Sequence, residues 1–226
     1  MLLAHGAGSS PEVVRRLLAP CLPDDAVVVA PLLLGGAHGS ADLLAAAADE
    51  REVVLAAGIS MGAHALALLA ARTGATWPIV AAMPAWTGTP GDVAAATAVA
   101  ADELERVGSA AVLDALAADP LTRDDWVREE LAAGWAAYDD DSLVAALRAG
   151  ASSAAPTIAD LATLRSPTAV VALADDPLHP ASVALEWARS VPRAALRTVE
   201  RHAPRYDRAA LGRAAADALA ELSGSR

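Results

Sequence analysis

Residues 52–62, Glu-Val-Val-Leu-Ala-Ala-Gly-Ile-Ser-Met-Gly, read as a buried strand that runs directly into a Gly-x-Ser-x-Gly turn. The apolar helical run 63–71 follows without a break. Gly58 and Gly62 remove Cβ atoms where strand and helix crowd together, so the serine between them can occupy a sharp turn with its hydroxyl above the sheet. We therefore expect Ser60 to be the nucleophile of an active site. The alternative is a glycine-rich turn that carries an inert serine.

The composition bounds the class of protein. The chain has 226 residues, of which 55% are hydrophobic, enough to bury one sizeable core or a core with a small appended cap. A formal net charge of −11 and a pI near 4.8 argue against nucleic acid or an anionic membrane as partner, because phosphate groups repel an acidic surface. We therefore expect a small-molecule substrate.

The cysteine content and the N-terminal segment favour a soluble cytoplasmic protein. Cys21 is the only cysteine, so neither an intramolecular disulfide nor a cysteine zinc cluster can form. The N-terminus lacks the basic stretch of a secretory signal, and no apolar run is long enough to span a bilayer. The five histidines have no Glu or Cys at ligand spacing, so we expect no metal site and no cofactor.

Short apolar runs alternate with alanine-rich helical stretches, which predicts an α/β fold with a mostly parallel sheet flanked by helices. About six strands are expected, at residues 1–4, 26–33, 52–58, 77–85, 168–174 and 194–199. The flanking helices are expected at residues 11–19, 41–48, 63–72, 181–190 and 208–222. Weakly charged helices such as 41–48 would serve equally to cover the sheet or to pack against a second copy, so a homodimer stays open.

Residues 89–165 interrupt this alternation, because they contain several helical segments and no convincing strand. An all-helical insertion at this position would lie over the carboxyl ends of the strands, where ligands bind in open α/β folds. We expect a core domain made of residues 1–88 and 166–226, with 89–165 forming a helical cap or lid.

Aromatic residues within the expected cap offer candidates for substrate binding. Trp126, Trp135 and Tyr138 could line a pocket beneath the cap, or could be ordinary packing residues of a helical hairpin. His64 lies one turn after Ser60 on the expected elbow helix, so we expect it to be buried rather than to act as a base.

A serine hydroxyl is a weak nucleophile that needs a base, a group that orients the base, and donors for the oxyanion. In this fold class the acid follows a later strand and the histidine follows the last one. Asp175 and Asp176 follow the expected strand 168–174, and His202 follows the final strand. The order Ser60, Asp176, His202 meets this requirement.

With these parts in order, the chain resembles the α/β-hydrolase superfamily over nearly its whole length. The first strand ends in His5-Gly6-Ala7-Gly8, which looks like the oxyanion loop of that superfamily. The resemblance implies an oxyanion hole made by the backbone N–H groups of Ala7 and Met61, with His5 holding the loop by a ring hydrogen bond. The chain begins at this strand, so we expect the first strands of that fold to be missing, either because this is a minimal member or because the true start lies upstream.

The resemblance also bears on the acid and the base. In capped members of the superfamily a loop of the form Asp-Pro-x-x-Pro supplies the acid, which favours Asp176 over the alternative Asp175. The histidine of such enzymes commonly sits in a Gly-His pair, whereas Arg201 precedes His202 in this chain. His179 lies close to the acid and competes as the base.

The expected function is that of a serine hydrolase that cleaves a small carboxylic ester, thioester or lactone through an acyl-enzyme on Ser60. The same triad could instead perform carbon–carbon bond hydrolysis, acyl transfer, or a lyase or cyclase step in secondary metabolism, since fold does not fix function. A ligand-binding member without catalysis is the third alternative. Haloalkane dehalogenases and epoxide hydrolases are disfavoured, because those relatives carry Asp at the elbow.

Overall fold

A parallel β-sheet lies at the centre of the molecule. The computed structural model describes residues 1–23, 25, 27–119, 122 and 125–224. Within these residues the strands are β1 (Leu2–Ala4), β2 (Ala56–Ile59), β3 (Ile79–Ala82), β4 (Thr168–Leu173) and β5 (Ala194–Val199). They pair in the order β1-β2-β3-β4-β5, and every pair is parallel. The predicted α/β fold with a mostly parallel sheet is therefore confirmed.

The strand expected at 26–33 is reduced to a single bridge in the described part of that segment. The N–H of Leu3 donates to the carbonyl of Val29 at 2.8 Å, and the N–H of Val29 donates to the carbonyl of Met1 at 3.0 Å. Pro31 follows and has no N–H to continue the ladder. Since Leu2 donates to Leu55 on the other side, β1 pairs with β2 along one edge and with Val29 at a single bridge on the other.

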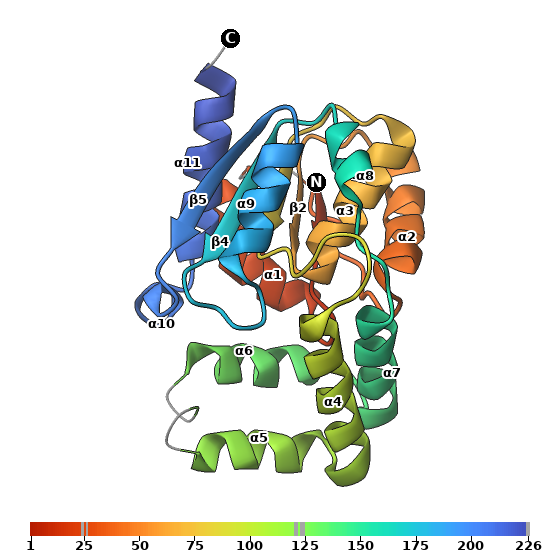
Figure 1. Ribbon diagram of the computed structural model, residues 1–226, viewed down its shortest axis with the longest axis vertical. Helices are drawn as coiled ribbons and strands as arrows, with labels where there is room; N and C mark the ends of the chain where they lie inside the picture. Colours follow the sequence, from red (N-terminus) through yellow and green to blue (C-terminus); the bar gives the residue numbers. More distant parts are fainter. Residues whose placement is uncertain (24, 26, 120–121, 123–124, 225–226) are drawn as a thin grey trace.

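Helices cover both faces of the sheet, as the alternation of buried side chains along each strand requires. Leu3 of β1 packs on one face with α1 (Pro11–Leu18) and α11 (Ala210–Gly224). Its neighbour Leu2 packs on the other face with α2 (Ala37–Asp49) and α3 (Met61–Thr73). The second face continues over β4 beneath α8 (Ile158–Ala162) and α9 (Ala181–Ser190) (Figure 1). Two short elements complete the fold, the 3-10 turn η1 (Ala19–Cys21) and α10 (Ala203–Tyr206).

The chain between β3 and β4 forms a separate layer of helices. These are α4 (Asp92–Val107), α5 (Ser109–Ala118), α6 (Trp126–Trp135) and α7 (Asp140–Ala151). Figure 1 shows them below the carboxyl ends of the strands, and we call them the inserted helices. Their own core is small and consists of Ala101, Leu104, Trp135, Leu143, Val144 and Leu147.

The two ends of the inserted segment are joined to each other. The N–H of Gly88 donates to the carbonyl of Pro156 at 3.0 Å, and the N–H of Ala155 donates to the carbonyl of Gly88 at 2.8 Å. The chain therefore leaves the sheet and returns to it at one point. Among the described residues, none of the helices combines the length and the apolar character that crossing a bilayer requires.

Candidate active site

Ser60 occupies a strained turn between β2 and α3. Its backbone has φ 54° and ψ −120°, a left-handed value that a residue with a Cβ seldom adopts. A Cβ on Gly58 would lie 2.6 Å from the backbone carbon of Gly62, and one on Gly62 would lie 2.0 Å from the carbonyl oxygen of Ala4. The two glycines are thus sterically required, as the sequence pattern predicts for an elbow.

The hydroxyl of Ser60 faces a histidine and, through it, a carboxylate. The Oγ of Ser60 lies 3.1 Å from Nε2 of His179, and Nδ1 of His179 lies 3.0 Å from Oδ2 of Asp176. Both side chains are largely shielded, with 19% of His179 and 12% of Asp176 exposed. The distances are those of a nucleophile in contact with a base and a base in contact with an orienting acid.

The structure corrects the expected partner of Ser60, because it places His179 rather than His202 against the hydroxyl. His202 is exposed and precedes α10 as its N-cap residue. The reason lies in the loop after β4, which folds back over the elbow and carries its own histidine to the serine. The spacing Asp-x-x-His in residues 176–179 is the sequence signal for this arrangement.

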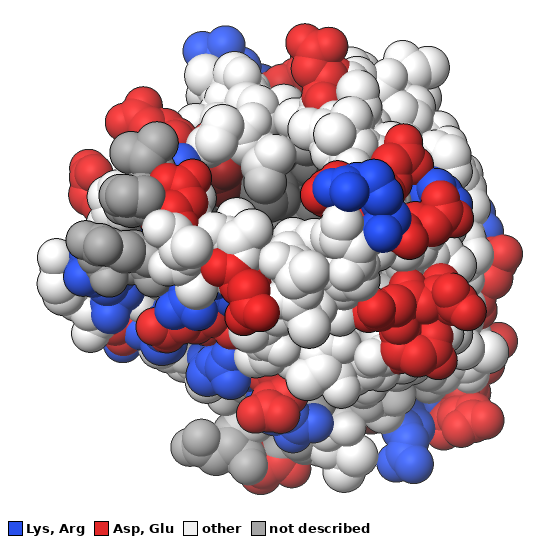
Figure 2. Space-filling view, turned by 90° about the horizontal axis from the view of Figure 1, so that it is seen from below, with Lys and Arg blue, Asp and Glu red and all other residues white. Residues whose placement is uncertain are grey.

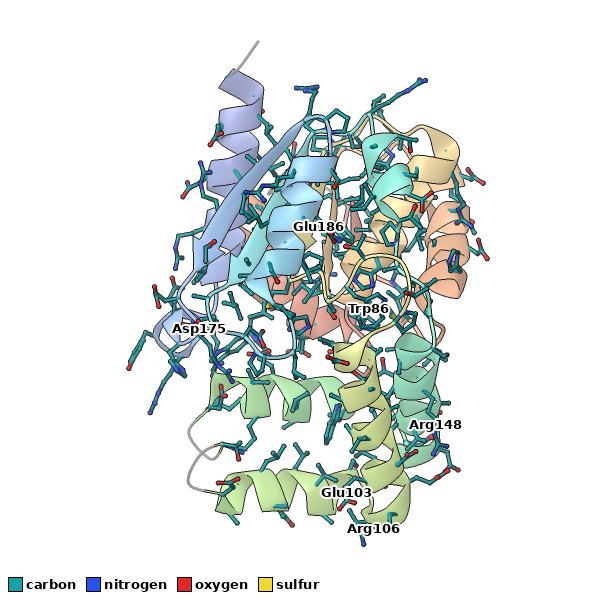
Figure 3. The ribbon with its side chains drawn as sticks, in the orientation of Figure 1. Trp86, Glu103, Arg106, Arg148, Asp175 and Glu186 are labelled. Carbon is teal, nitrogen blue, oxygen red and sulfur yellow. The ribbon has the colours of Figure 1, made fainter. Side chains whose placement is uncertain are left out.

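A tight turn fixes which of the two neighbouring aspartates faces the histidine. Asp175 has a left-handed φ of 55°, and its side chain is exposed (Figure 3). Asp176 turns inward, and its Oδ1 accepts a hydrogen bond from the N–H of Leu178 at 2.9 Å. The structure therefore brings Asp176, and not Asp175, to His179.

Electrostatics keep Asp176 ionised. Burial alone would raise the pKa of this carboxyl, but the hydrogen bond and charge of His179, the N–H of Leu178 and the charge of Arg201 together hold the pKa below its ordinary value. An ionised carboxylate at this position favours the imidazolium that forms when His179 accepts a proton.

The residues expected to form an oxyanion hole lie together beside Ser60. The loop after β1 approaches so closely that a Cβ on Gly6 would lie 3.4 Å from Cβ of Ser60. Ala7 and Met61 both lie near Gly150 of α7. A Cβ added to Gly150 would lie 2.7 Å from Cβ of Ala7 and 3.7 Å from Sδ of Met61. Met61 is the first residue of α3, where backbone N–H groups have no partner within the helix.

His5 holds the loop that carries Ala7. The Nε2 of His5 accepts from the N–H of Leu33 at 2.8 Å, so the proton of the neutral ring is on Nδ1, which lies 2.8 Å from the carbonyl of Gly6. Burial lowers the pKa of His5, which favours this neutral form. The ring is a structural support and does not reach the hydroxyl of Ser60.

Two of the three aromatic residues proposed for substrate binding, Trp126 and Tyr138, anchor the inserted helices to the rest of the protein. Trp126 is 4% exposed and packs in the core between the sheet, α1 and α11. Tyr138 donates its hydroxyl to the carbonyl of Ser9 at 2.7 Å, and burial raises the pKa of Tyr138 to about 12. Trp135 is 8% exposed and belongs to the small core of the inserted helices. All three have packing roles.

Sequence reasoning did not single out the aromatic residues that surround His64. The ring of His64 is fully buried, with Trp86 at 4.9 Å and Trp187 at 5.6 Å between ring centroids. Its Nε2 accepts from the N–H of Ala85 at 3.1 Å. Burial first and the charge of His179 second lower the pKa of His64 to about 3, so the ring stays neutral. His64 thus fixes the loop after β3, where Figure 3 labels Trp86.

Charged side chains, most of them acidic, are frequent on the surface of the inserted helices. Figure 2 looks onto this side and shows acidic and basic side chains gathered in clusters, some of them beside a hollow. One such cluster joins α7 to α4, where Arg148 pairs with Asp102 and with Glu105, each at 2.8 Å. Among the described residues, no group of three His, Cys, Asp or Glu side chains is arranged to hold a metal ion.

Several solved structures with a similar fold are named as esterases, lactonases or hydrolases. A carboxylesterase of Nitrososphaera gargenis superposes with a TM-score of 0.79 at 13% identity, over 100% of this chain and 91% of that one. MenH from S. aureus superposes with a TM-score of 0.75 at 16% identity, over 98% of this chain and 93% of that one. The enol-lactonase of Burkholderia xenovorans LB400 superposes with a TM-score of 0.69 at 18% identity, over 99% of this chain and 90% of that one. No protein-family model and no curated protein sequence matches the chain. At these identities the likeness shows the fold, which is that of the α/β hydrolases.

Proposed function

We propose that this chain, which has the fold of the α/β hydrolases, is a serine hydrolase that cleaves a small carboxylic ester, thioester or lactone. One observation carries the proposal: His179 lies within hydrogen-bonding distance of both Ser60 and Asp176, at 3.1 and 3.0 Å. A histidine so placed can take the hydroxyl proton of a serine that the elbow holds above the sheet.

The reaction proceeds in two halves on this geometry. Oγ of Ser60 attacks the substrate carbonyl carbon while its proton passes to Nε2 of His179, and the resulting imidazolium is stabilised by Asp176. His179 then protonates the departing alcohol, thiol or lactone oxygen, which leaves an acyl-enzyme on Ser60. Water gives its proton to His179 and attacks this ester, and the carboxylic acid is released when Ser60 recovers its proton.

The negative oxygen of each tetrahedral intermediate requires donors that are in place beforehand. The backbone N–H groups of Ala7 and Met61 are the proposed donors, and each would contribute about 3 to 4 kcal/mol to stabilising the transition state. The N-terminus of α3 adds its partial positive charge at the same point. The close approach of Gly150 to Ala7 and its contact with Met61 support this assignment, because the two proposed donor residues then lie against the same helix.

The inserted helices act as a cap in this proposal, within the segment 89–165 expected from the sequence, and residues 1–88 and 166–226 form the core. The end of that segment, α8, packs on the sheet and is counted with the core. The position of the inserted helices beyond the carboxyl ends of the strands supports that role, because substrates of such folds bind there (Figure 1).

The test is the intact mass of the protein after incubation with a fluorophosphonate, which reacts with an activated serine whatever the natural substrate. We expect a single adduct on the wild type, none on Ser60→Ala, and strongly slowed labelling of His179→Ala. His202→Ala is the matched control, since its ring is exposed, and should label as the wild type does. A folded wild type that forms no adduct would contradict the proposal in favour of a binding protein.

A further inference from the structure

Arg201, in the turn that follows β5, contacts both the loop after β4, which carries Asp176 and His179, and the cap. Its Nη2 pairs with Oδ2 of Asp125 at 3.0 Å, and its Nη1 donates to the carbonyl of Asp175 at 3.4 Å. Its own carbonyl accepts a hydrogen bond from Nε1 of Trp126 at 2.9 Å. One residue thus connects the turn after β4, the turn after β5 and the first turn of α6.

The ion pair between Arg201 and Asp125 is shielded from solvent. The side chains are 28% and 14% exposed, whereas the pair of Arg106 with Glu103 on α4 is 68% and 48% exposed. Partial burial strengthens the attraction between the charges and raises the cost of leaving one of them alone. Asp125 is also the N-cap of α6, where it accepts from the N–H of Val127 at 3.1 Å, so the pair is fixed to the start of that helix.

The carbonyl of Asp175 is an informative partner because it belongs to the peptide that joins Asp175 to Asp176. Asp175 has a left-handed φ of 55°, which persists only where the surroundings hold it. A change of ψ at Asp175 would turn this carbonyl and carry Asp176 with it, away from His179. The guanidinium of Arg201 opposes this rotation by holding the carbonyl oxygen.

Charge adds to this positional effect. Arg201 is among the groups that hold the pKa of Asp176 below its ordinary value, after the stronger effects of burial and of His179. The charged and titratable groups around the acid-base pair are Asp175 in the same loop, Arg201 after β5, Asp125 on α6 and His64 on α3. Of these groups only Arg201 has a fixed positive charge.

We propose that Arg201 is a positioning residue that couples the seating of the cap to the Asp176–His179 pair. It does so by holding the Asp175 carbonyl with one nitrogen and α6 with the other. This inference rests on the proposed function, because it concerns how that acid-base pair is kept in place.

The test compares variants at Arg201 by the second-order rate of fluorophosphonate labelling as a function of pH. We expect Arg201→Gln to slow labelling about tenfold at neutral pH, equivalent to about 1.4 kcal/mol. The pH at which labelling is lost on acidification should also rise, because the positive charge that helps to hold the pKa of Asp176 down is gone. Arg201→Lys keeps the positive charge, so that pH should stay the same. Its labelling should still be slowed, because an ammonium cannot hold both partners in the geometry of the planar fork.

Two further variants separate coupling to the cap from a local effect on the loop. Asp125→Asn keeps the N-cap of α6 but removes the charge, and should slow labelling several-fold. Asp139→Asn is its matched control, because Asp139 caps α7 in the same way by accepting from the N–H of Ser142 at 2.7 Å. Arg205→Gln, at an exposed position on α10, is the control for Arg201→Gln.

The outcomes distinguish the inference from the proposed function. If Arg201→Gln labels with the rate and pH profile of the wild type, Arg201 is not a positioning residue. If Arg201→Gln is slow while Asp125→Asn matches Asp139→Asn, the coupling to the cap is overturned. A folded wild type that does not label would contradict the proposed function itself and leave no reaction for Arg201 to support.

Discussion

Nδ1 of His179 lies 3.0 Å from Oδ2 of Asp176, three positions earlier in the same loop. The base and the group that orients it are therefore parts of one short turn, held in shape by Pro177 and by the hydrogen bond from Leu178 to Asp176. Ser60, by contrast, comes from an elbow 119 positions away in the sequence. Catalysis in this proposal depends on how one loop is seated against one turn.

Replacing the histidines should discriminate between the two candidate bases. His179→Ala should lower kcat/KM for a short-chain p-nitrophenyl ester by roughly a thousandfold or more, because the hydroxyl of Ser60 loses its proton acceptor. His202→Ala should stay within about twofold of the wild type, as exposed substitutions usually do. Equal losses of kcat/KM in the two variants would show that His179 is not the distinct base of Ser60 in solution.

Adding a methyl group at Gly150 should affect activity through the packing of α7. Gly150→Ala places a Cβ 2.7 Å from Cβ of Ala7, so α7 or the oxyanion loop must shift. Overpacking of this kind costs about 1 to 3 kcal/mol, and we expect kcat to fall more than the affinity for substrate. Steady-state kinetics with the same ester measure this split.

Gly39→Ala is the matched control for that experiment. Gly39 is exposed in α2, and a Cβ there would meet no atom within 4 Å. The change should stabilise the protein by about 0.4 to 1 kcal/mol without affecting kcat. A loss of activity in Gly39→Ala equal to that in Gly150→Ala would contradict the role of close packing at α7.

The stability of the protein should depend on the ionisation of Asp176 at acid pH. Its pKa in the folded state lies below the ordinary value of 3.8, so the ionised carboxylate contributes stability above that value and loses it as pH falls through the folded pKa. The difference in the free energy of unfolding between wild type and Asp176→Asn should therefore be largest near neutral pH and shrink below about pH 4. Urea denaturation at several pH values measures it.

Asp175→Asn serves as the control, because its side chain is exposed and Asn tolerates the left-handed backbone. A difference between wild type and Asp176→Asn that does not change between neutral and acid pH would contradict the role of charge in this contact.

The ion pairs of Glu130 beneath α6 should contribute more to the free energy of unfolding than the exposed ion pair of Glu103 on α4. Glu130 is 8% exposed and pairs with Arg16 of α1 at 2.5 Å and with Arg208, before α11, at 3.4 Å. Glu130→Gln leaves two guanidinium groups without their shared carboxylate, and should lower the free energy of unfolding by about 1 to 3 kcal/mol.

The comparison for Glu130 is Glu103 on α4, whose ion pair with Arg106 is exposed (Figure 3). Glu103→Gln should leave the denaturation midpoint unchanged within error, because exposed ion pairs contribute little. If both variants denature at the same midpoint, the ion pairs of Glu130 do not tie α6 to the core.

The nucleophile could be predicted from the sequence because its signal is local. Gly58, Ser60 and Gly62 lie within five positions, and the steric demand of the elbow selects those residue types. The sheet was likewise predictable from the alternation of apolar strands and helices. The strand expected at 26–33 was not, because the apolar run hides the effect of Pro31 on the ladder.

The partner of Ser60 could not be chosen from the sequence, because that choice depends on the path of a loop. Both His179 and His202 follow strands that end at the same edge of the sheet, and the expected order of the parts along the chain favoured His202, which is not the histidine that reaches Ser60. The contact of His179 with Ser60 joins residues 119 positions apart in the sequence, and the sequence pattern does not reveal such a tertiary contact. Trp126 and Tyr138 were ambiguous for the same reason, since a helix pattern does not reveal the far partner of a ring.

The reciprocal hydrogen bonds between Gly88 and the 155–156 segment make the inserted helices an interchangeable part. Because the chain departs and returns at one point, segments of different length can be placed there without altering the strands, and each doubling of length adds only about 0.6 kcal/mol of closure entropy. A replacement segment that keeps Trp126, Glu130 and Tyr138 in their positions against the core would retain their contacts with it. Exchange of this segment between related proteins is thus a route by which one catalytic core could acquire new substrates.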